Sequence, residues 1–209
     1  MSLQGDYLKA CIPEPFRVLG QRLKPYSLGH AFILNRLGSP FAVDFGKRVP
    51  SLGDLYFAIW VCRRKYADAI IGLQNASFVK DVKWLKLLSR FKNTDVAKVL
   101  FTKYIVLSAQ VPDIWRSSEK DARTLTMPHL LYLKFIMTSK YGYSVKEVMD
   151  IPYGEALWSS LAYSESKGGC TFLTDEQHNI REMRDQLLKE AQEEHPELKP
   201  MYPTNGDGR

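Results

Sequence analysis

The sequence predicts an all-α protein, and three observations lead to this class. Apolar residues recur three and four positions apart over most of the chain, which is the spacing of a helix face. Serine or threonine precedes most of these apolar segments, and glycine or proline follows them. Only one segment alternates as a strand does. We therefore predict a compact domain of roughly eight helices over residues 1–195, divided near residues 112–125, with one short extended hairpin near residues 39–50 and a flexible tail over residues 196–209.

The densest helix signals lie in the third quarter of the chain. Residues 126–142 begin with a threonine cap, carry a proline in the first turn and end at a glycine. Ser144 and Glu147 have the spacing of a capping box, in which the serine hydroxyl accepts from a backbone N–H and the glutamate reaches back to the cap residue. Residues 152–168 start at a proline and end at a second glycine. Three consecutive helices are therefore expected here.

Six further segments show helical periodicity: residues 27–36, 51–62, 67–73, 78–91, 94–111 and 174–195. The expected caps are Ser27, Ser51, Thr94 and Thr174, each placed directly before an apolar segment. The opening residues 1–23 are predicted to be irregular because two prolines interrupt their apolar positions.

Composition indicates a chain that buries a core in a reducing compartment. Of the 209 residues, 45% are hydrophobic and 12% aromatic, the composition of a folded protein. The cysteines, Cys11, Cys62 and Cys170, are odd in number and far apart, so a disulfide framework is not expected. The chain does not open on a secretory signal pattern, and no apolar run reaches membrane-spanning length. These observations predict a cytoplasmic protein without a membrane partner.

The net charge of +6 is unevenly distributed along the chain. Residues 61–104 contain ten basic and three acidic residues, whereas residues 174–198 contain three basic and eight acidic ones. Four of the basic residues, Lys80, Lys83, Lys86 and Arg90, fall on one side of the predicted helix over residues 78–91. Such a face is a candidate contact surface for phosphates. The alternative is a solvated face screened by the acidic C-terminal helix, and the sequence favours this alternative because it contains no nucleic-acid-binding motif.

No pattern of catalytic or metal-ligating residues appears in the sequence. The histidines fall on different predicted elements, and none has a second histidine or cysteine at ligand spacing: His30, His129, His178 and His195. Neither a nucleotide-binding glycine motif nor a nucleophile elbow is present. We therefore predict a protein that is not an enzyme, with no catalytic residue, metal or cofactor.

Two tryptophans are candidate structural anchors. Trp60 and Trp158 each lie inside a predicted helix with apolar neighbours at helical spacing. Such positions are typical of large side chains that the core surrounds. We predict that both indoles are buried.

The helix pattern also resembles a known class of phage protein. Residues 143–152 read Tyr-Ser-Val-Lys-Glu-Val-Met-Asp-Ile-Pro, and Glu-Ala-Leu-Trp follows at residues 155–158. A long helix, a short Ser-x-x-Glu-Val-x-x-x-Pro helix and an aromatic-bearing helix that ends near glycine occur in this order. The arrangement resembles tailed-phage tail assembly chaperones and other small helical proteins of phage morphogenesis. Residues 25–30, 37–40 and 51–55 are similar to phage-encoded proteins as well.

The resemblance implies a non-enzymatic protein of the host cytoplasm. It implies that the chain binds hydrophobic helices of a tail tape-measure protein, or tail-tube subunits, before the tail assembles. A second hypothesis, from the charge distribution, is a nucleic-acid-binding or packaging-associated protein that uses the basic residues 61–104. A third hypothesis is a structural component of the virion.

Overall fold

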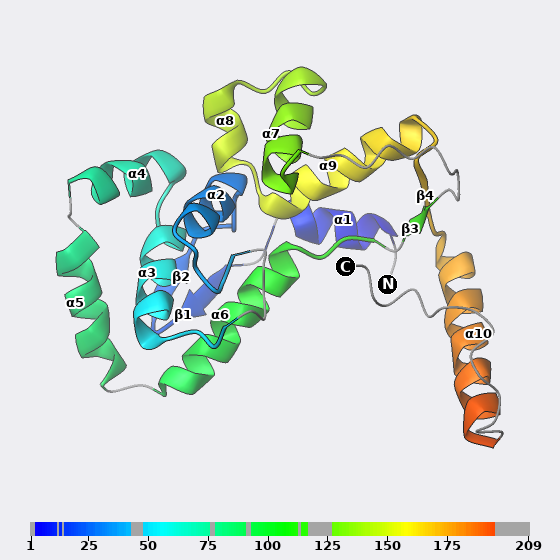
Figure 1. Cartoon of the computed structure of the whole chain (residues 1–209), viewed down its shortest axis with the longest axis horizontal. Helices are drawn as coiled ribbons and strands as arrows, with labels where there is room; N and C mark the ends of the chain where they lie inside the picture. The colour runs from blue at the N-terminus through cyan, green and yellow to red at the C-terminus, as the bar shows by residue number, and fades with distance from the viewer. Residues whose placement is uncertain are drawn as a thin grey trace.

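The computed structural model describes residues 3–11, 13, 15–42, 48–75, 78–90, 93–112, 114–116 and 127–194. Over these residues the chain forms ten helices and two small antiparallel sheets (Figure 1). The predicted, mostly helical class is therefore confirmed. The helices are α1 Leu3–Cys11, α2 Leu28–Arg36, α3 Leu52–Cys62, α4 Tyr66–Gln74, α5 Phe78–Ser89, α6 Thr94–Ser108, α7 His129–Ser139, α8 Val145–Asp150, α9 Tyr153–Ser166 and α10 Asp175–Glu194. The strands are β1 Phe16–Val18, β2 Gln21–Leu23, β3 Ile114–Arg116 and β4 Cys170–Phe172.

Capping side chains start many of these helices as the sequence predicts. The backbone N–H of Ser144 donates to the Glu147 carboxylate at 2.9 Å, and the Glu147 N–H donates to Ser144 Oγ at 3.3 Å. This reciprocal pair is the predicted capping box of α8. Ser51 starts α3 through an equivalent pair with Asp54.

Two predicted helix starts are wrong. The cap of α6 is Asn93, whose side-chain oxygen accepts from the backbone N–H groups of Asp95 and Val96, so Thr94 is the first helical residue. A carboxamide one residue earlier therefore takes the role assigned to the threonine hydroxyl. Helix α7 begins at His129, and Pro128 takes the cap position outside the first turn. The predicted threonine cap at residue 126 and the predicted tail at residues 196–209 lie outside the described residues.

The strands do not occur where the sequence predicted them. Residues 39–42 form a turn, in which the Ala42 N–H donates to the Ser39 carbonyl at 2.9 Å, and residues 48–50 contain no strand; residues 43–47 lie outside the described part. The opening residues, predicted to be irregular, instead form α1 and the β1–β2 hairpin. Strand β3 lies within residues 112–125, where the domain was predicted to divide, and it pairs with β4. Three-residue strands are too short to show alternation, which explains why the pattern missed them.

The β1–β2 hairpin turns through Leu19 and Gly20. Both residues have positive φ, 50° and 79°, as in the two-residue turn that matches the twist of paired strands. Gly20 adopts this conformation without steric cost. Leu19 is buried, and a positive φ is sterically unfavourable for it because it has a Cβ. Burial of Leu19 against the core offsets that cost.

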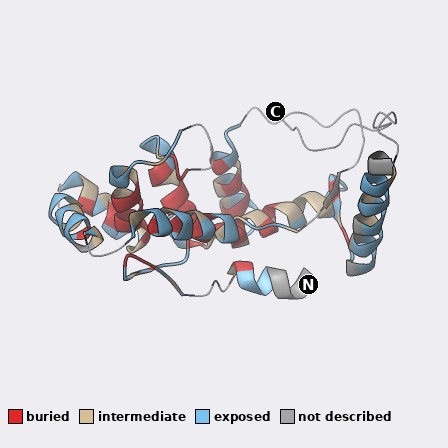
Figure 2. Cartoon of the chain, turned by 90° about the horizontal axis from the view of Figure 1, so that it is seen from below, coloured by how far each residue is buried: buried red, intermediate tan, exposed pale blue. Residues whose placement is uncertain are grey.

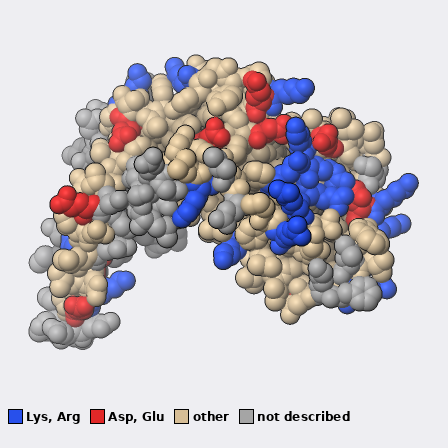
Figure 3. Space-filling model, turned by 180° about the vertical axis from the view of Figure 1, so that it is seen from behind, with Lys and Arg blue, Asp and Glu red and all other residues tan. Residues whose placement is uncertain are grey.

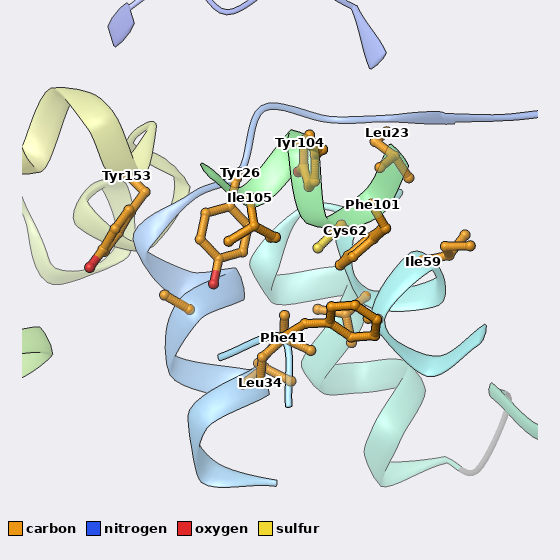
Figure 4. Packing of buried hydrophobic residues seen from close by; sticks show 14 of the residues in the cluster. Leu23, Tyr26, Leu34, Phe41, Ile59, Cys62, Phe101, Tyr104, Ile105 and Tyr153 are labelled. Atoms are coloured by element: carbon orange, nitrogen blue, oxygen red, sulfur yellow. The ribbon is translucent and has the colours of Figure 1, made fainter. Parts of the chain in front are cut away.

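A single cluster of buried aromatic and aliphatic side chains lies between α2, α3, α6 and α9 (Figures 2 and 4). The Tyr26 ring sits edge-on to the rings of Tyr104 and Tyr153, with centroids 5.9 and 5.6 Å apart. Phe41 meets Phe101 in the same way at 4.8 Å. Residues from the first and second halves of the chain therefore build one core.

Backbone hydrogen bonds join these two halves directly. The Leu28 N–H donates to the Ile151 carbonyl at 3.0 Å, and the Tyr153 N–H donates to the Tyr26 carbonyl at 2.7 Å. The start of α2 therefore lies against the junction of α8 and α9, and this close approach requires Gly29. A Cβ at Gly29 would lie 2.6 Å from the Met149 carbonyl oxygen in α8 and 2.5 Å from the Tyr66 ring, so no larger residue fits without movement. We call this junction the α2–α9 seam.

The buried His30 joins the seam to the turn that follows α3 through a hydrogen bond. Its Nδ1 accepts from the Ser27 N–H at 3.1 Å, which places the ring proton on Nε2, and Nε2 donates to the Arg64 carbonyl at 2.8 Å. Burial lowers the pKa of His30 to about 4, because the charged imidazolium would lose its hydration. The neutral ring is thus the form that the fold holds.

The lowered pKa of His30 predicts acid sensitivity. Its ordinary pKa is about 6.5, so between pH 6.5 and pH 4 the unfolded chain binds a proton that the folded chain excludes. Stability is therefore full above pH 6.5, falls as the pH drops through this window, and loses up to about 3 kcal/mol by pH 4. Urea denaturation at a series of pH values measures this slope.

The control separates His30 from other titrating groups. His30→Gln should lower stability at pH 7 but flatten the slope between pH 6.5 and pH 4. His129→Gln should keep most of the slope, although partial burial also lowers the pKa of His129. An unchanged slope in His30→Gln would contradict the assignment.

Candidate functional site

The four predicted basic residues lie together on the outer side of α5. Lys80, Lys83 and Lys86 are exposed on the helix, and Arg90 is exposed directly after its end. Among the described residues, no carboxylate lies within ion-pair distance of any of them. Trp84 is 53% exposed on the same helix, and its position places an aromatic ring at the border of the basic face. Trp84 was not predicted as a contact residue, although its spacing places it next to Lys80.

A second group of basic residues lies on the β1–β2 hairpin. Arg17 and Arg22 are register partners, so two exposed side chains of like charge stand directly opposite each other. Such a pair is unfavourable unless a counter-charge is supplied. Arg22, Lys24 and Arg63 line an open depression of about 440 Å³ beside the hairpin. Figure 3 shows Lys and Arg gathered over the half of the molecule that carries α3, α5 and the hairpin.

Asp81 neutralises part of this basic region. Its carboxylate accepts from the Trp60 indole N–H at 3.0 Å and pairs with the Arg64 guanidinium, and Arg63 lies 3.8 Å away. The Arg64 guanidinium also stacks 4.5 Å from the centroid of the Trp60 ring. Partial burial and the neighbouring Arg63 lower the pKa of Arg64, while Asp81 opposes the change. Arg64 therefore serves to pack the fold. The basic residues of the predicted segment 61–104 thus include some that are paired within the fold and others that are exposed.

Helix α6 exposes an apolar stripe that the sequence pattern did not predict. Its members are 36–67% exposed and recur at helical spacing: Val96, Val99, Leu100, Val106 and Leu107. The opposite side of α6 packs into the core through Phe101, Tyr104 and Ile105. Among the described residues of α6, Lys103 is the cation that lies between the members of this stripe. We call these five apolar residues the α6 stripe. Sequence periodicity missed it because α6 is apolar on two sides, and only packing shows which side is covered.

Helix α10 carries a second exposed apolar stripe. Ile180, Met183, Leu187 and Leu188 are each at least 50% exposed and follow the predicted helical spacing. Thr174 and Gln177 start the helix as predicted, through reciprocal hydrogen bonds of 3.0 and 3.3 Å. The predicted stripe is therefore present, but α10 extends away from the main body (Figure 1). We call these four residues the α10 stripe.

Several polar side chains around a second open depression hold the fold together. This open hollow of about 620 Å³ lies at the start of α8 and α9. Ser144 and Glu147 along its wall are engaged in the α8 cap, and the Asp150 carboxylate accepts from the Tyr66 N–H at 3.1 Å. Within the described residues, no three of His, Cys, Asp or Glu are grouped as metal ligands. On the same wall the Tyr143 hydroxyl donates to the Glu155 carboxylate at 3.4 Å.

Comparisons of the chain with protein-family models, curated proteins and solved structures find no match. In the part of the chain that the structure describes, every helix is too short or too polar to cross a bilayer. The candidate site is thus defined by geometry: two exposed apolar stripes and an exposed basic surface.

The candidate anchors lie in the core. Trp60 is completely buried, and Trp158 is 5% exposed with its indole N–H donating to the Gln110 carbonyl at 3.2 Å. The Trp158 ring also stacks on Phe172, with centroids 5.9 Å apart.

Each anchor should contribute strongly to stability. Trp60→Ala and Trp158→Ala are each expected to lower the free energy of unfolding by about 3–5 kcal/mol, because truncation loses burial and leaves a cavity. Trp84→Ala, on the exposed face of α5, should change it by no more than about 0.5 kcal/mol. Chemical denaturation measures all three. A loss below about 1 kcal/mol for either anchor would contradict this role.

Proposed function

We propose that this chain binds apolar helices of a partner protein through the α6 stripe. The supporting observation is the stripe itself, in which five aliphatic side chains at helical spacing remain 36–67% exposed on a helix whose other side is packed. Contiguous exposed apolar surface of this kind is typical of a protein interface. An amphipathic partner helix binds such a surface through residues spaced three and four apart.

The proposed partners are phage tail proteins before assembly. The geometry supports a protein-binding surface, and the resemblance of residues 143–158 to tail assembly chaperones supplies the partner class. In this proposal the chain acts in the host cytoplasm and is not an enzyme. It covers an apolar helix of the tape-measure protein or of a tail-tube subunit. When the tail assembles, contacts within the tail replace the contact with this chain. A gene position directly before a very long tape-measure gene would support this partner.

Co-purification with the tape-measure protein or a tail-tube protein tests the proposal. Val99→Glu/Val106→Glu is expected to lose the complex, because both side chains are exposed in the stripe at 67% and 57% and a carboxylate there is poorly accommodated in an apolar contact. Circular dichroism should show an unchanged fold, since neither residue packs into the core. The wild-type complex should survive moderate salt.

The matched control removes charge and leaves the stripe intact. Lys80→Ala/Lys83→Ala/Lys86→Ala should retain the complex at wild-type yield. Loss of the complex in this variant, with retention in Val99→Glu/Val106→Glu, would assign partner binding to the basic face and overturn the proposal.

Nucleic-acid binding is the second candidate, and the free charges of α5 and the hairpin favour it. Lys80, Lys83 and Lys86 have no carboxylate within ion-pair distance among the described residues, and Arg17 stands opposite Arg22. A phosphate backbone would supply the missing counter-charge, and Trp84 offers a ring on which an unpaired base could stack.

Titration against duplex and single-stranded DNA separates the two functions. The helix-binding function predicts no DNA binding at about 50 mM salt, whereas the nucleic-acid function predicts binding that weakens steeply by about 200 mM, because neutralised phosphates release counterions. Lys80→Ala/Lys83→Ala/Lys86→Ala should then bind more weakly than the wild type.

A variant with three lysines removed elsewhere controls for net charge: Lys134→Ala/Lys140→Ala/Lys146→Ala. DNA binding that is sensitive to salt and is reduced only by the α5 changes would place the nucleic-acid function first. Equal reduction in both triple variants would indicate attraction by net charge alone.

A further inference from the structure

The α6 and α10 stripes are similar in length. The α6 stripe runs from Val96 to Leu107, and the α10 stripe runs from Ile180 to Leu188, with the half-buried Ala191 one turn further on. At 1.5 Å per residue the α6 stripe is about 16 Å long, and the α10 stripe is about 12 Å long, or about 16 Å with Ala191. Each helix therefore presents a narrow apolar row of the size that the other would cover.

Their charges are opposite. Helix α10 contains seven acidic and three basic residues, and the exposed Glu176 and Glu190 lie one turn from Ile180 and Leu187 on the apolar side. On α6, Asp95 pairs with Lys98 at 3.4 Å, whereas Lys103, within the stripe, has no carboxylate at ion-pair distance in the part of the chain that the structure describes. If a helix with the composition of α10 packed on α6, its carboxylates would lie near Lys103.

One copy of the chain does not bring its two stripes together. Helix α10 starts directly after β4, where Cys170 and Leu173 are buried and the Phe172 ring stacks on Trp158. From this fixed start α10 extends away from α6, and both stripes stay exposed (Figure 1). To cover α6 within one copy, α10 would have to break these contacts, whereas a second copy can present its α10 without such a change.

We propose that two copies of this chain associate by exchanging α10, with the α10 stripe of each copy seated on the α6 stripe of the other. The arrangement is symmetric and closed, because one pair of complementary surfaces is used twice. It goes beyond the proposed client binding and does not require it. A client helix and the partner's α10 would compete for the same face of α6, so self-association would protect the stripe until a client arrives.

The mass of the full-length protein in solution tests this proposal. Light scattering after size exclusion, from about 1 to about 100 µM, should give twice the chain mass for the wild type. Val106→Glu on α6 and Leu187→Glu on α10 should each raise the dissociation constant about tenfold or more. Val79→Glu, an equivalent change at a 42% exposed residue of α5, should leave the dimer intact. Circular dichroism verifies that each variant is folded.

A mixture of the two variants identifies which helices pair. Equimolar Val106→Glu and Leu187→Glu should regain association, because one copy keeps an intact α10 and the other an intact α6, which restores one of the two contacts. A wild type that stays monomeric throughout would overturn the proposal. So would a dimer that Val106→Glu leaves intact, since α10 would then pair with α10. If the protein forms the dimer but does not bind a tail protein, that result would contradict the proposed function and leave the proposed dimer standing.

Discussion

The α2–α9 seam is the constraint on which the rest of the structure depends. Two backbone hydrogen bonds join Tyr26 and Leu28 to residues more than a hundred positions later, and Gly29 leaves room for this approach because it has no Cβ. Pairing at such sequence separation carries a large loop-closure cost, so side chains must stabilise it. Tyr26 does so by packing its ring against rings from α6 and α9. The orientation of α6, and with it the exposed side of that helix, follows from this packing.

Burial of polar groups at the seam has a measurable cost. The Tyr26 hydroxyl is buried without a hydrogen-bond partner among the described residues, and burial raises its pKa well above the ordinary value. An unsatisfied buried hydroxyl costs about 1–3 kcal/mol. His30, in contrast, satisfies both ring nitrogens and thereby fixes its own tautomer. Apolar packing of the Tyr26 ring therefore outweighs the unsatisfied hydroxyl, whereas His30 contributes through its hydrogen bonds.

Local chemistry could be predicted from the sequence, and long-range pairing could not. The capping pairs Ser144–Glu147 and Thr174–Gln177 act within one helical turn, so the spacing of residue types is sufficient to identify them. The β3–β4 sheet joins residues more than fifty positions apart, and no local pattern marks it. The same distinction holds for the site. The basic residues of α5 were identified because a charged side chain on a helix is exposed almost wherever it occurs. The α6 stripe consists of residue types that also build cores. Only the packing of Phe101 and Tyr104 shows which side of α6 is covered.

The separation of charge within the fold bears on how the molecule meets a partner. The basic residues lie over α3, α5 and the hairpin, while the acidic residues of α10 extend from the opposite side (Figures 1 and 3). Because the two regions are held apart, neither neutralises the other at contact distance, and each keeps a field that acts on approaching molecules. Such fields affect the rate and orientation of association more than its strength. Apolar contact along a helix stripe would then supply the affinity. A surface that combines an apolar stripe with nearby basic charge favours partners that carry an apolar helix face bordered by acidic residues. Fewer proteins meet this condition than carry an apolar helix face alone.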